Sequence, residues 1–321
     1  MGFEGLSNKN KHFFFVLIKI SIVVVAFYFI YEKLTKNTDL EFSIFGQISM
    51  KNDVFLIKHM FFLSFLTIFN WFFEVLKWKE LVSSIKKISF KKAFEQCLGS
   101  LTASLFTPNR IGEYGAKALY YTKGYRKQIM LVNLISNLLQ MSITCIFGII
   151  GLFFLDQAHE ISMNKWPMIL LVSVILTTSI ILIIRRNRYS FKGFSFEKLK
   201  NFMSNFSKKS VALGLLFSLF RYAIFSFQFY YLLVLFGCEI SYFNAMTFVT
   251  SMYFLASIIP SIFIFDVVVK GSIAVFLFSL IGVTELVILS IVTIMWIFNF
   301  VLPSILGSYF VIRFKLPTLA R

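Results

Sequence analysis

The sequence is poor in acidic residues, cysteine, proline and histidine, and these shortages exclude several classes of protein. The 321 residues include 15 Asp and Glu together, three cysteines, five prolines and three histidines. Only 15% of residues are charged, too few to cover the surface of a soluble domain of this length. Cys97, Cys145 and Cys238 lie in or beside apolar segments without metal-ligand spacing, so we interpret them as small buried side chains. We therefore expect neither a soluble domain nor a metal or other cofactor.

Long apolar runs are abundant instead, and 58% of the residues are hydrophobic. A helix needs about 20 apolar residues to cross the hydrocarbon core of a bilayer. The first run is too long for the core of a signal peptide, and no small-x-small cleavage site follows it, so we interpret it as a retained span. The sequence predicts an all-α integral membrane protein, with residues 1–321 forming a single transmembrane domain. Six full spans are predicted, at residues 13–31, 54–76, 129–155, 166–184, 211–236 and 285–312.

Positive charge predicts the orientation of these spans. Loops facing the cytoplasm carry an excess of Lys and Arg, whereas residues 237–245 have none and residues 156–165 have one. We therefore place both termini in the cytoplasm and the protein in a bacterial cytoplasmic (inner) membrane. The net charge of +17 does not indicate nucleic acid as a partner, because the basic residues sit beside the spans. The basic regions are residues 77–92, 110–127, 185–209 and 313–321.

Two further apolar regions, residues 93–121 and 245–282, are each interrupted by a proline, and neither half reaches about 20 residues. The charge pattern requires each region to begin and end on one side of the membrane. We predict two re-entrant helical hairpins, although two short full spans would satisfy the charges equally. The halves 13–155 and 166–312 then form inverted-topology repeats, an architecture that places substrate sites near the midplane of the membrane.

The two hairpins share a pattern of ionisable residues. A proline is followed five or six positions later by an acid, and four positions after the acid by a lysine. That last spacing places acid and lysine on one helical face in the order that favours an ion pair. Such pairs can hold the hairpins closed and can also line a pathway, since the two roles do not exclude each other. The residues are Pro108, Glu113 and Lys117 in the first hairpin, and Pro260, Asp266 and Lys270 in the second.

Arg221 lies ten residues into its predicted span, about 15 Å deep at 1.5 Å per residue. A cation at that depth needs an anionic partner, for which we consider Asp266, Glu113 or a lipid phosphate.

Two other features are interpreted as structural. Glu74 lies nearer the cytoplasmic interface and is expected to pair with Lys77 or Lys79. Residues 191–206 place phenylalanines at near-helical spacing with lysines between them, which predicts a connecting helix resting on the membrane surface.

At the hairpin residues the chain resembles the flippase-like transmembrane family of lysylphosphatidylglycerol synthases and their stand-alone relatives. The run from Thr107 to Glu113 resembles the family's first Pro-x-x-x-Gly-Glu signature, and the run from Pro260 to Gly271 resembles its second-half pattern. The second departs at positions 262–264, where glycines are frequent in the family. The resemblance assigns the hairpin breaks to Pro108, Gly112, Pro260 and Gly271. It implies movement of lipids between leaflets, and we expect no aminoacyl-transferase domain because the chain ends at Arg321.

We predict a translocase that admits a phospholipid or polyprenyl-phosphate head group between the hairpins. No catalytic constellation is present, since His12, His59 and His159 fall in unrelated places. Two alternatives stay open, a membrane-embedded enzyme acting on lipid phosphates and a non-transporting subunit that works with envelope-biosynthesis partners. The residues expected to attract the phosphate are Arg110, Lys117, Arg221 and Lys270, with Glu113 and Asp266 holding these cations in place.

Overall fold

The structure is a computed structural model that describes most of the bundle. The described residues are 54–105, 107, 111–159, 190–191, 194–195, 202, 206–258 and 266–317, with six helical positions between 17 and 28; at 158–159, 190–191, 194–195 and 266–270 only the backbone is described. The predicted span 166–184 and most of the span 13–31 lie outside these residues. So do Pro108, Arg110 and Pro260.

Among the described residues, four helical stretches are long and apolar enough to cross a membrane, and they confirm four of the predicted spans. Three are single helices, α3 (Ile57–Val82), α6 (Arg126–His159) and α9 (Lys208–Leu235). The fourth consists of α12 (Glu285–Trp296), the π-helical turn η3 (Ile297–Val301) and α13 (Leu302–Arg313).

The π-helical turn has a local cause in Pro303. Proline has no N–H, so it cannot donate to the carbonyl four residues earlier, at Asn299. Trp71 of α3 donates its indole Nε1 to that carbonyl oxygen at 3.2 Å. The hydrogen bond that the helix lacks is thus replaced by a contact between helices, as buried backbone groups in a membrane require.

Two pairs of shorter helices form hairpins, α4 (Phe90–Ser104) with α5 (Gly112–Leu119), and α10 (Tyr242–Ile258) with α11 (Asp266–Ser279). In the first, Thr107 Oγ1 donates to the carbonyl of Ser104 at 2.6 Å and accepts from the backbone N–H of Gly112 at 3.0 Å. A Cβ on Gly112 would lie 2.9 Å from Thr107 Cγ2, so the close turn requires glycine.

Gly271 does not break the second hairpin, contrary to the prediction. It lies inside α11, where an added Cβ would come within 3.3 Å of Leu289 Cδ2 on α12. Its small size therefore serves the packing of α11 against α12 rather than the turn between α10 and α11.

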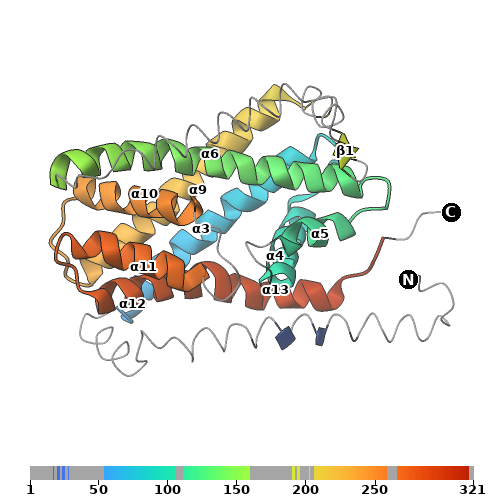
Figure 1. The fold of residues 1–321 in the computed structure, drawn as a ribbon. Helices are drawn as coiled ribbons and strands as arrows, with labels where there is room; N and C mark the ends of the chain where they lie inside the picture. The colour runs from blue at the N-terminus through green and yellow to red at the C-terminus, as the bar shows by residue number, and fades with distance from the viewer. Residues whose placement is uncertain are drawn as a thin grey trace.

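Helices from the two halves of the chain pack against each other (Figure 1). α3 lies against α9, α4 against α13, and α10 against α6. Glycines allow two of these contacts, because an added Cβ would lie 2.2 Å from the Leu98 carbonyl oxygen at Gly307 and 2.1 Å from Phe254 Cβ at Gly148. Close backbone approach at small residues is the usual way in which membrane helices associate.

Gly307→Ala is expected to weaken the α4–α13 contact, because the neighbour it would meet is backbone and cannot rotate away. Overpacking of this kind costs about 1–3 kcal/mol, so the melting temperature of the purified protein should fall. Gly115 on α5 has nothing within 4 Å of an added Cβ, and Gly115→Ala is the control that should leave it unchanged or slightly raised. Equal melting temperatures for the two variants would contradict this packing.

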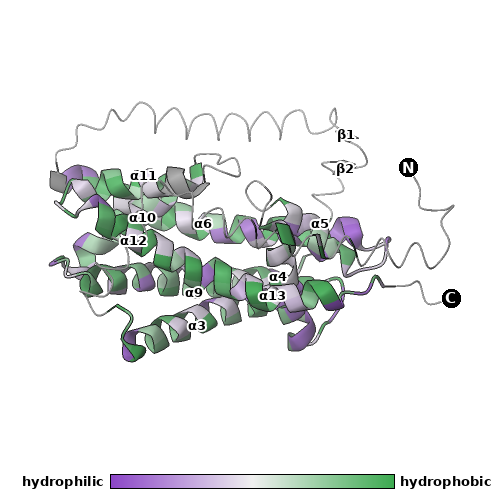
Figure 2. Cartoon of the chain, turned by 90° about the horizontal axis from the view of Figure 1, so that it is seen from below, coloured by the Kyte–Doolittle hydropathy of each residue, from purple (hydrophilic) through white to green (hydrophobic). Residues whose placement is uncertain are grey.

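The basic loops lie together at one end of the bundle. Ser210, at the start of α9, donates its hydroxyl to Glu80 Oε1 near the end of α3 at 2.9 Å. The Tyr120 and Phe314 rings, 4.8 Å apart, bring the end of α5 to the end of α13. Hydrophilic residues gather mainly at the ends of the helices (Figure 2). The basic residues at this end are Lys86, Lys87, Lys91, Lys92, Arg126, Lys127, Lys208, Lys209, Arg313 and Lys315.

The predicted surface helix at 191–206 is wrong at its beginning. Residues Ser190–Phe191 (β1) and Phe194–Ser195 (β2) form a two-residue antiparallel ladder in which Ser190 pairs with Ser195. The sequence has Gly193 between the strands, and tight hairpin turns favour glycine because it adopts positive φ without steric cost. The spacing of the phenylalanines alone did not register this local preference.

Candidate functional site

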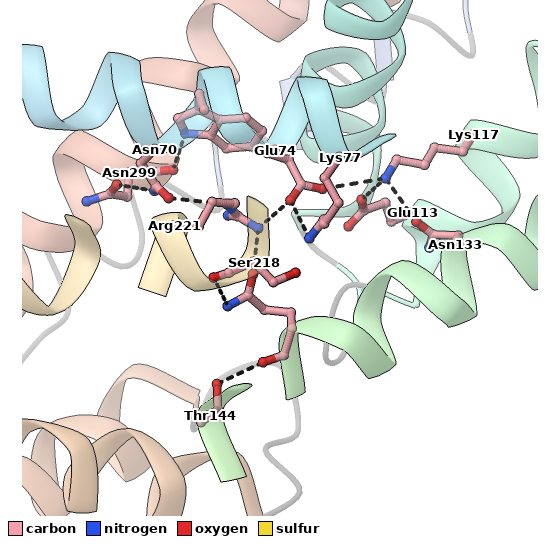
Figure 3. A network of polar contacts seen from close by, with 12 residues as sticks. Asn70, Glu74, Lys77, Glu113, Lys117, Asn133, Thr144, Ser218, Arg221 and Asn299 are labelled. Atoms are coloured by element: carbon pink, nitrogen blue, oxygen red, sulfur yellow. Dashed lines mark hydrogen bonds and ion pairs between the residues drawn. The ribbon is translucent and has the colours of Figure 1, made fainter. Parts of the chain in front are cut away.

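Among the described residues, five charged side chains meet inside the bundle (Figure 3). They come from three elements: α3, the first hairpin and α9. Three are cations and two are carboxylates, so their formal charges sum to +1. They are Glu74 and Lys77 on α3, Glu113 and Lys117 on α5, and Arg221 on α9.

Glu74 is the centre of this ion cluster. Its carboxylate forms an ion pair with Arg221, lies 2.8 Å from Lys77 Nζ, and lies 4.0 Å from Lys117 Nζ. The predicted pairing of Glu74 with Lys77 is confirmed. The described partner of Arg221 is Glu74, which was not among the acidic partners predicted for it. Glu74 thus connects α3 to both α9 and the first hairpin.

The second carboxylate confirms the predicted pair on α5. Glu113 lies 2.7 Å from Lys117 Nζ, one helical turn away. Lys117 also donates to Asn133 Oδ1 on α6 at 2.9 Å, and its ammonium lies 4.1 Å from the centre of the Trp78 ring. Only 1% of the Lys117 side chain is exposed, so these contacts replace nearly all of its hydration. A lysine this deeply buried remains charged only where such partners surround it.

A layer of neutral groups holds Trp78 in place beneath Lys117. Gln96 on α4 accepts hydrogen bonds at Oε1 from Trp78 Nε1 at 2.8 Å and from the Tyr121 hydroxyl at 2.9 Å. Burial raises the pKa of Tyr121 to about 12, so the phenol keeps its proton and remains a donor. The first hairpin is therefore fastened to α3 by a neutral hydrogen-bond network as well as by charge.

Arg221 occupies the more open side of the cluster. Its Nε donates to Asn70 Oδ1 at 3.2 Å, and its Nη1 donates to Gln140 Oε1 at 3.3 Å. The Arg221 side chain is 19% exposed, compared with 10% for Glu74. Arginine presents five donors in a planar fork that matches carboxylate and phosphate groups. Arg221 is the most exposed of the three cations of the cluster and is therefore the one best placed to meet a ligand.

Neutral amides continue the network away from Arg221. Asn70 Nδ2 donates to Asn299 Oδ1 at 2.9 Å, and Asn299 Nδ2 donates to Gln228 Oε1 at 2.9 Å. Gln228 Nε2 in turn donates to Thr67 Oγ1 at 3.1 Å. The π-helical turn η3, which contains Asn299, therefore helps to position Asn70, whose side-chain oxygen accepts from Arg221.

Sequence reasoning missed the central role of Glu74, although a signal was present. Thr67, Asn70, Glu74 and Lys77 follow one another at spacings of three and four residues, which places them on one face of α3. A polar stripe along an otherwise apolar span faces the interior of a bundle rather than lipid. That pattern would have placed Glu74 opposite the other buried charges.

The second hairpin contributes less to what is described. Asp266 begins α11 and Lys270 follows one turn later, but their side chains lie outside the described residues. Their ion pair, and any contact with Arg221, stays a prediction. The same holds for Arg110 and for the two hairpin prolines.

The chemistry of the ion cluster suits an anion. In the part of the chain that the structure describes, no group of three or more His, Cys, Asp or Glu residues could hold a metal ion. An excess of cations on donors of this type attracts phosphate, and charge-assisted hydrogen bonds to phosphate are roughly twice as strong as neutral ones.

Comparison with known proteins identifies one family. The model of the family described as the lysylphosphatidylglycerol synthase TM region matches residues 16–307, which is most of the chain. No curated protein and no solved structure matches the sequence.

Proposed function

Because the chain belongs to the lysylphosphatidylglycerol synthase transmembrane-region family, we propose that it moves a phospholipid or a lipid-linked phosphate between the leaflets of a bacterial cytoplasmic membrane. Membership of the family indicates a multi-pass membrane protein of lipid metabolism or transport. The leaflet-to-leaflet step is the proposal.

One observation carries it: a cationic ion cluster inside a bundle of apolar helices, with Arg221 at its more open side. Charges at this depth are costly and usually mark the path of a polar substrate. Arg221 and Lys117 would hold the phosphate, and Glu74 and Glu113 would keep the two cations in position before it arrives. Arg110 and Lys270 are proposed to extend this set from the two hairpins.

The pattern of helix contacts supports an arrangement in inverted repeats. If α3, α4, α5 and α6 correspond to α9, α10, α11 and the α12–α13 rod, each contact has a counterpart: α4 packs on α13 as α10 packs on α6, and α4 packs on α5 as α10 packs on α11. Inverted repeats create similar access paths from both faces of a membrane. We propose that the hairpins re-enter the membrane from opposite sides, the first from the cytoplasm.

The shared basic end supports the proposed orientation. Lys and Arg gather at the ends of α3, α5 and α13 and at the starts of α4, α6 and α9. The opposite end includes Asp156, Glu239 and Glu285. Retention of basic loops in the cytoplasm would place both termini there.

Leaflet-resolved lipid exchange in proteoliposomes tests the function. Wild-type protein should exchange a labelled phospholipid between leaflets faster than protein-free vesicles, with no new lipid product on chromatography. Arg221→Gln should lower the rate at least about tenfold, because a hydrogen bond to a charged group is worth about 1.5–3 kcal/mol.

The matched control is Arg313→Gln. Arg313 is exposed at the end of α13, with its guanidinium carbon 4.5 Å from the centre of the Tyr309 ring. This variant should exchange lipid at the wild-type rate. If wild type, Arg221→Gln and Arg313→Gln all exchange equally, Arg221 does not bind the moving lipid; if none exceeds protein-free vesicles, the translocase proposal fails.

A further inference from the structure

A second set of polar atoms lies inside the bundle, apart from the five charged side chains of the ion cluster. Six buried side-chain atoms have no hydrogen-bond partner among the described residues. Native proteins leave few buried polar groups unpaired, and each one calls for a water, an ion or a ligand. The atoms are Asn133 Nδ2 and Ser136 Oγ on α6, Ser218 Oγ, Tyr222 OH and Ser226 Oγ on α9, and Tyr253 OH on α10; we call them the hydroxyl row.

The hydroxyl row begins at the ion cluster. Asn133 accepts from Lys117 through its oxygen, while its amide nitrogen is unpaired. Ser136 lies one turn further along α6, and Gln140, one turn beyond, donates its Nε2 to the carbonyl of Ser218 on α9 at 3.4 Å. The row thus passes from α6 to α9 beside the glutamine that also contacts Arg221.

On α9 the row continues along one face. Ser218, Tyr222 and Ser226 are spaced by four residues, so their side chains cover about 12 Å of one side of the helix. None of the three is more than 7% exposed. The hydroxyls of Tyr222 and Ser226 lie near each other, one helical turn apart, but their geometry is not that of an ordinary hydrogen bond.

The row ends against the second hairpin. The rings of Tyr222 and Tyr253 are 6.2 Å apart, and Tyr253 lies on α10. Phe147 stacks on Tyr222 with ring centres 5.2 Å apart, and Phe225 lies 5.2 Å from Tyr253. Aromatic rings therefore border the hydroxyl row on this side. Because Tyr253 is its last member, the row extends from the ion cluster to α10.

We propose that the hydroxyl row lines a hydrated passage that receives the uncharged, hydroxyl-bearing part of a lipid head group, such as glycerol or a sugar, while its phosphate lies at Arg221 and Lys117. All six atoms are neutral, and together they offer both donors and acceptors, as a polyol requires. None is a carboxylate, so the row offers no opposite charge to an ammonium head group. The ligand assignment rests on the proposed function; the hydration of the passage does not.

Cysteine accessibility tests the passage. In a background with Cys97, Cys145 and Cys238 replaced by Ala, single Ser218→Cys and Ser226→Cys variants are treated with a membrane-impermeant methanethiosulfonate reagent. The control is Leu232→Cys, at a fully buried apolar position of the same helix. Serine positions in a hydrated passage should react at least about tenfold faster, because reaction at a dry site requires local opening. Reaction no faster than at Leu232→Cys overturns the proposal.

The head-group assignment is tested on the same variants. Ser226→Cys protein is placed in vesicles of phosphatidylcholine alone or of phosphatidylcholine mixed with phosphatidylglycerol. The glycerol head group should slow modification of the thiol, whereas equal rates in the two membranes would overturn the ligand assignment. If wild-type protein moves no lipid while both thiols still react, the translocase proposal fails and the hydrated passage stands.

Removal of the hydroxyls gives an independent measurement. Tyr222→Phe and Tyr253→Phe delete one oxygen each without changing the rings. A hydroxyl that binds water or ligand contributes to stability, so the melting temperature should stay the same or fall. A dry, unpaired hydroxyl is unfavourable, so its removal should raise the melting temperature. A rise in both variants would overturn the hydrated passage, and a fall in Tyr121→Phe, which loses its bond to Gln96, shows that the assay detects a paired hydroxyl.

Discussion

Glu74→Gln is expected to destabilise the protein by about 3–5 kcal/mol and to abolish lipid exchange, because removing one partner of a buried ion pair leaves the others uncompensated. Glu74 contacts Arg221, Lys77 and, at 4.0 Å, Lys117. Without its charge, the three cations of the cluster would face Glu113 as the remaining carboxylate among these five side chains. The measurement is the melting temperature in detergent, together with exchange in proteoliposomes.

A control variant and a double variant test whether this loss of stability comes from the ion pair between Glu74 and Arg221. Glu80→Gln removes a carboxylate from the same helix near the basic end, where it accepts from Ser210, and should cost no more than about 1.5 kcal/mol. The double variant Glu74→Gln with Arg221→Gln removes one charge of each sign and should recover most of the stability but none of the exchange. If Glu74→Gln melted at the same temperature as Glu80→Gln, Glu74 would not be the centre of the cluster.

The sequence is sufficient to predict features that depend on neighbours along the chain. Apolar runs of sufficient length predicted the four described spans, because transfer of an apolar helix into the hydrocarbon core is favourable whatever the rest of the fold. Glu113 and Lys117 were paired correctly because four residues of helix bring them together without help from the rest of the fold. The same applies to the basic loops, whose common end of the bundle follows from the direction of the spans.

Contacts between helices were beyond that reasoning. Glu74 and Arg221 are far apart in the chain, and their meeting depends on the register in which α3 crosses α9. Such a register depends on close contacts at small residues, as where Gly214 of α9 lies against Leu81 of α3, and a pattern of hydrophobicity does not encode these contacts. Gly271 was misjudged for the same reason, since a glycine that breaks a helix and a glycine that admits a neighbouring helix look alike in sequence.

Lys117→Met should have an effect as large as that of Glu74→Gln. It removes the ammonium that contacts Glu113, Asn133 and the face of Trp78, and so deletes the ion pair between residues 113 and 117. The first hairpin should loosen from α3 and α6, at a cost of about 3–5 kcal/mol, and exchange should fall to the protein-free rate. Lys123→Met, at an exposed position after α5, is the matched control and should resemble wild type.

A double variant separates a structural role from a role in binding. Lys117→Met combined with Glu113→Gln removes both charges of the pair, so most of the lost melting temperature should return. Exchange should not return, because the phosphate still lacks one of its two proposed cations. If exchange recovers together with stability, the pair only holds the hairpin closed. Of the two cations proposed to bind the phosphate, Arg221 alone would then remain. The lipid would pass along α9 rather than beside α5.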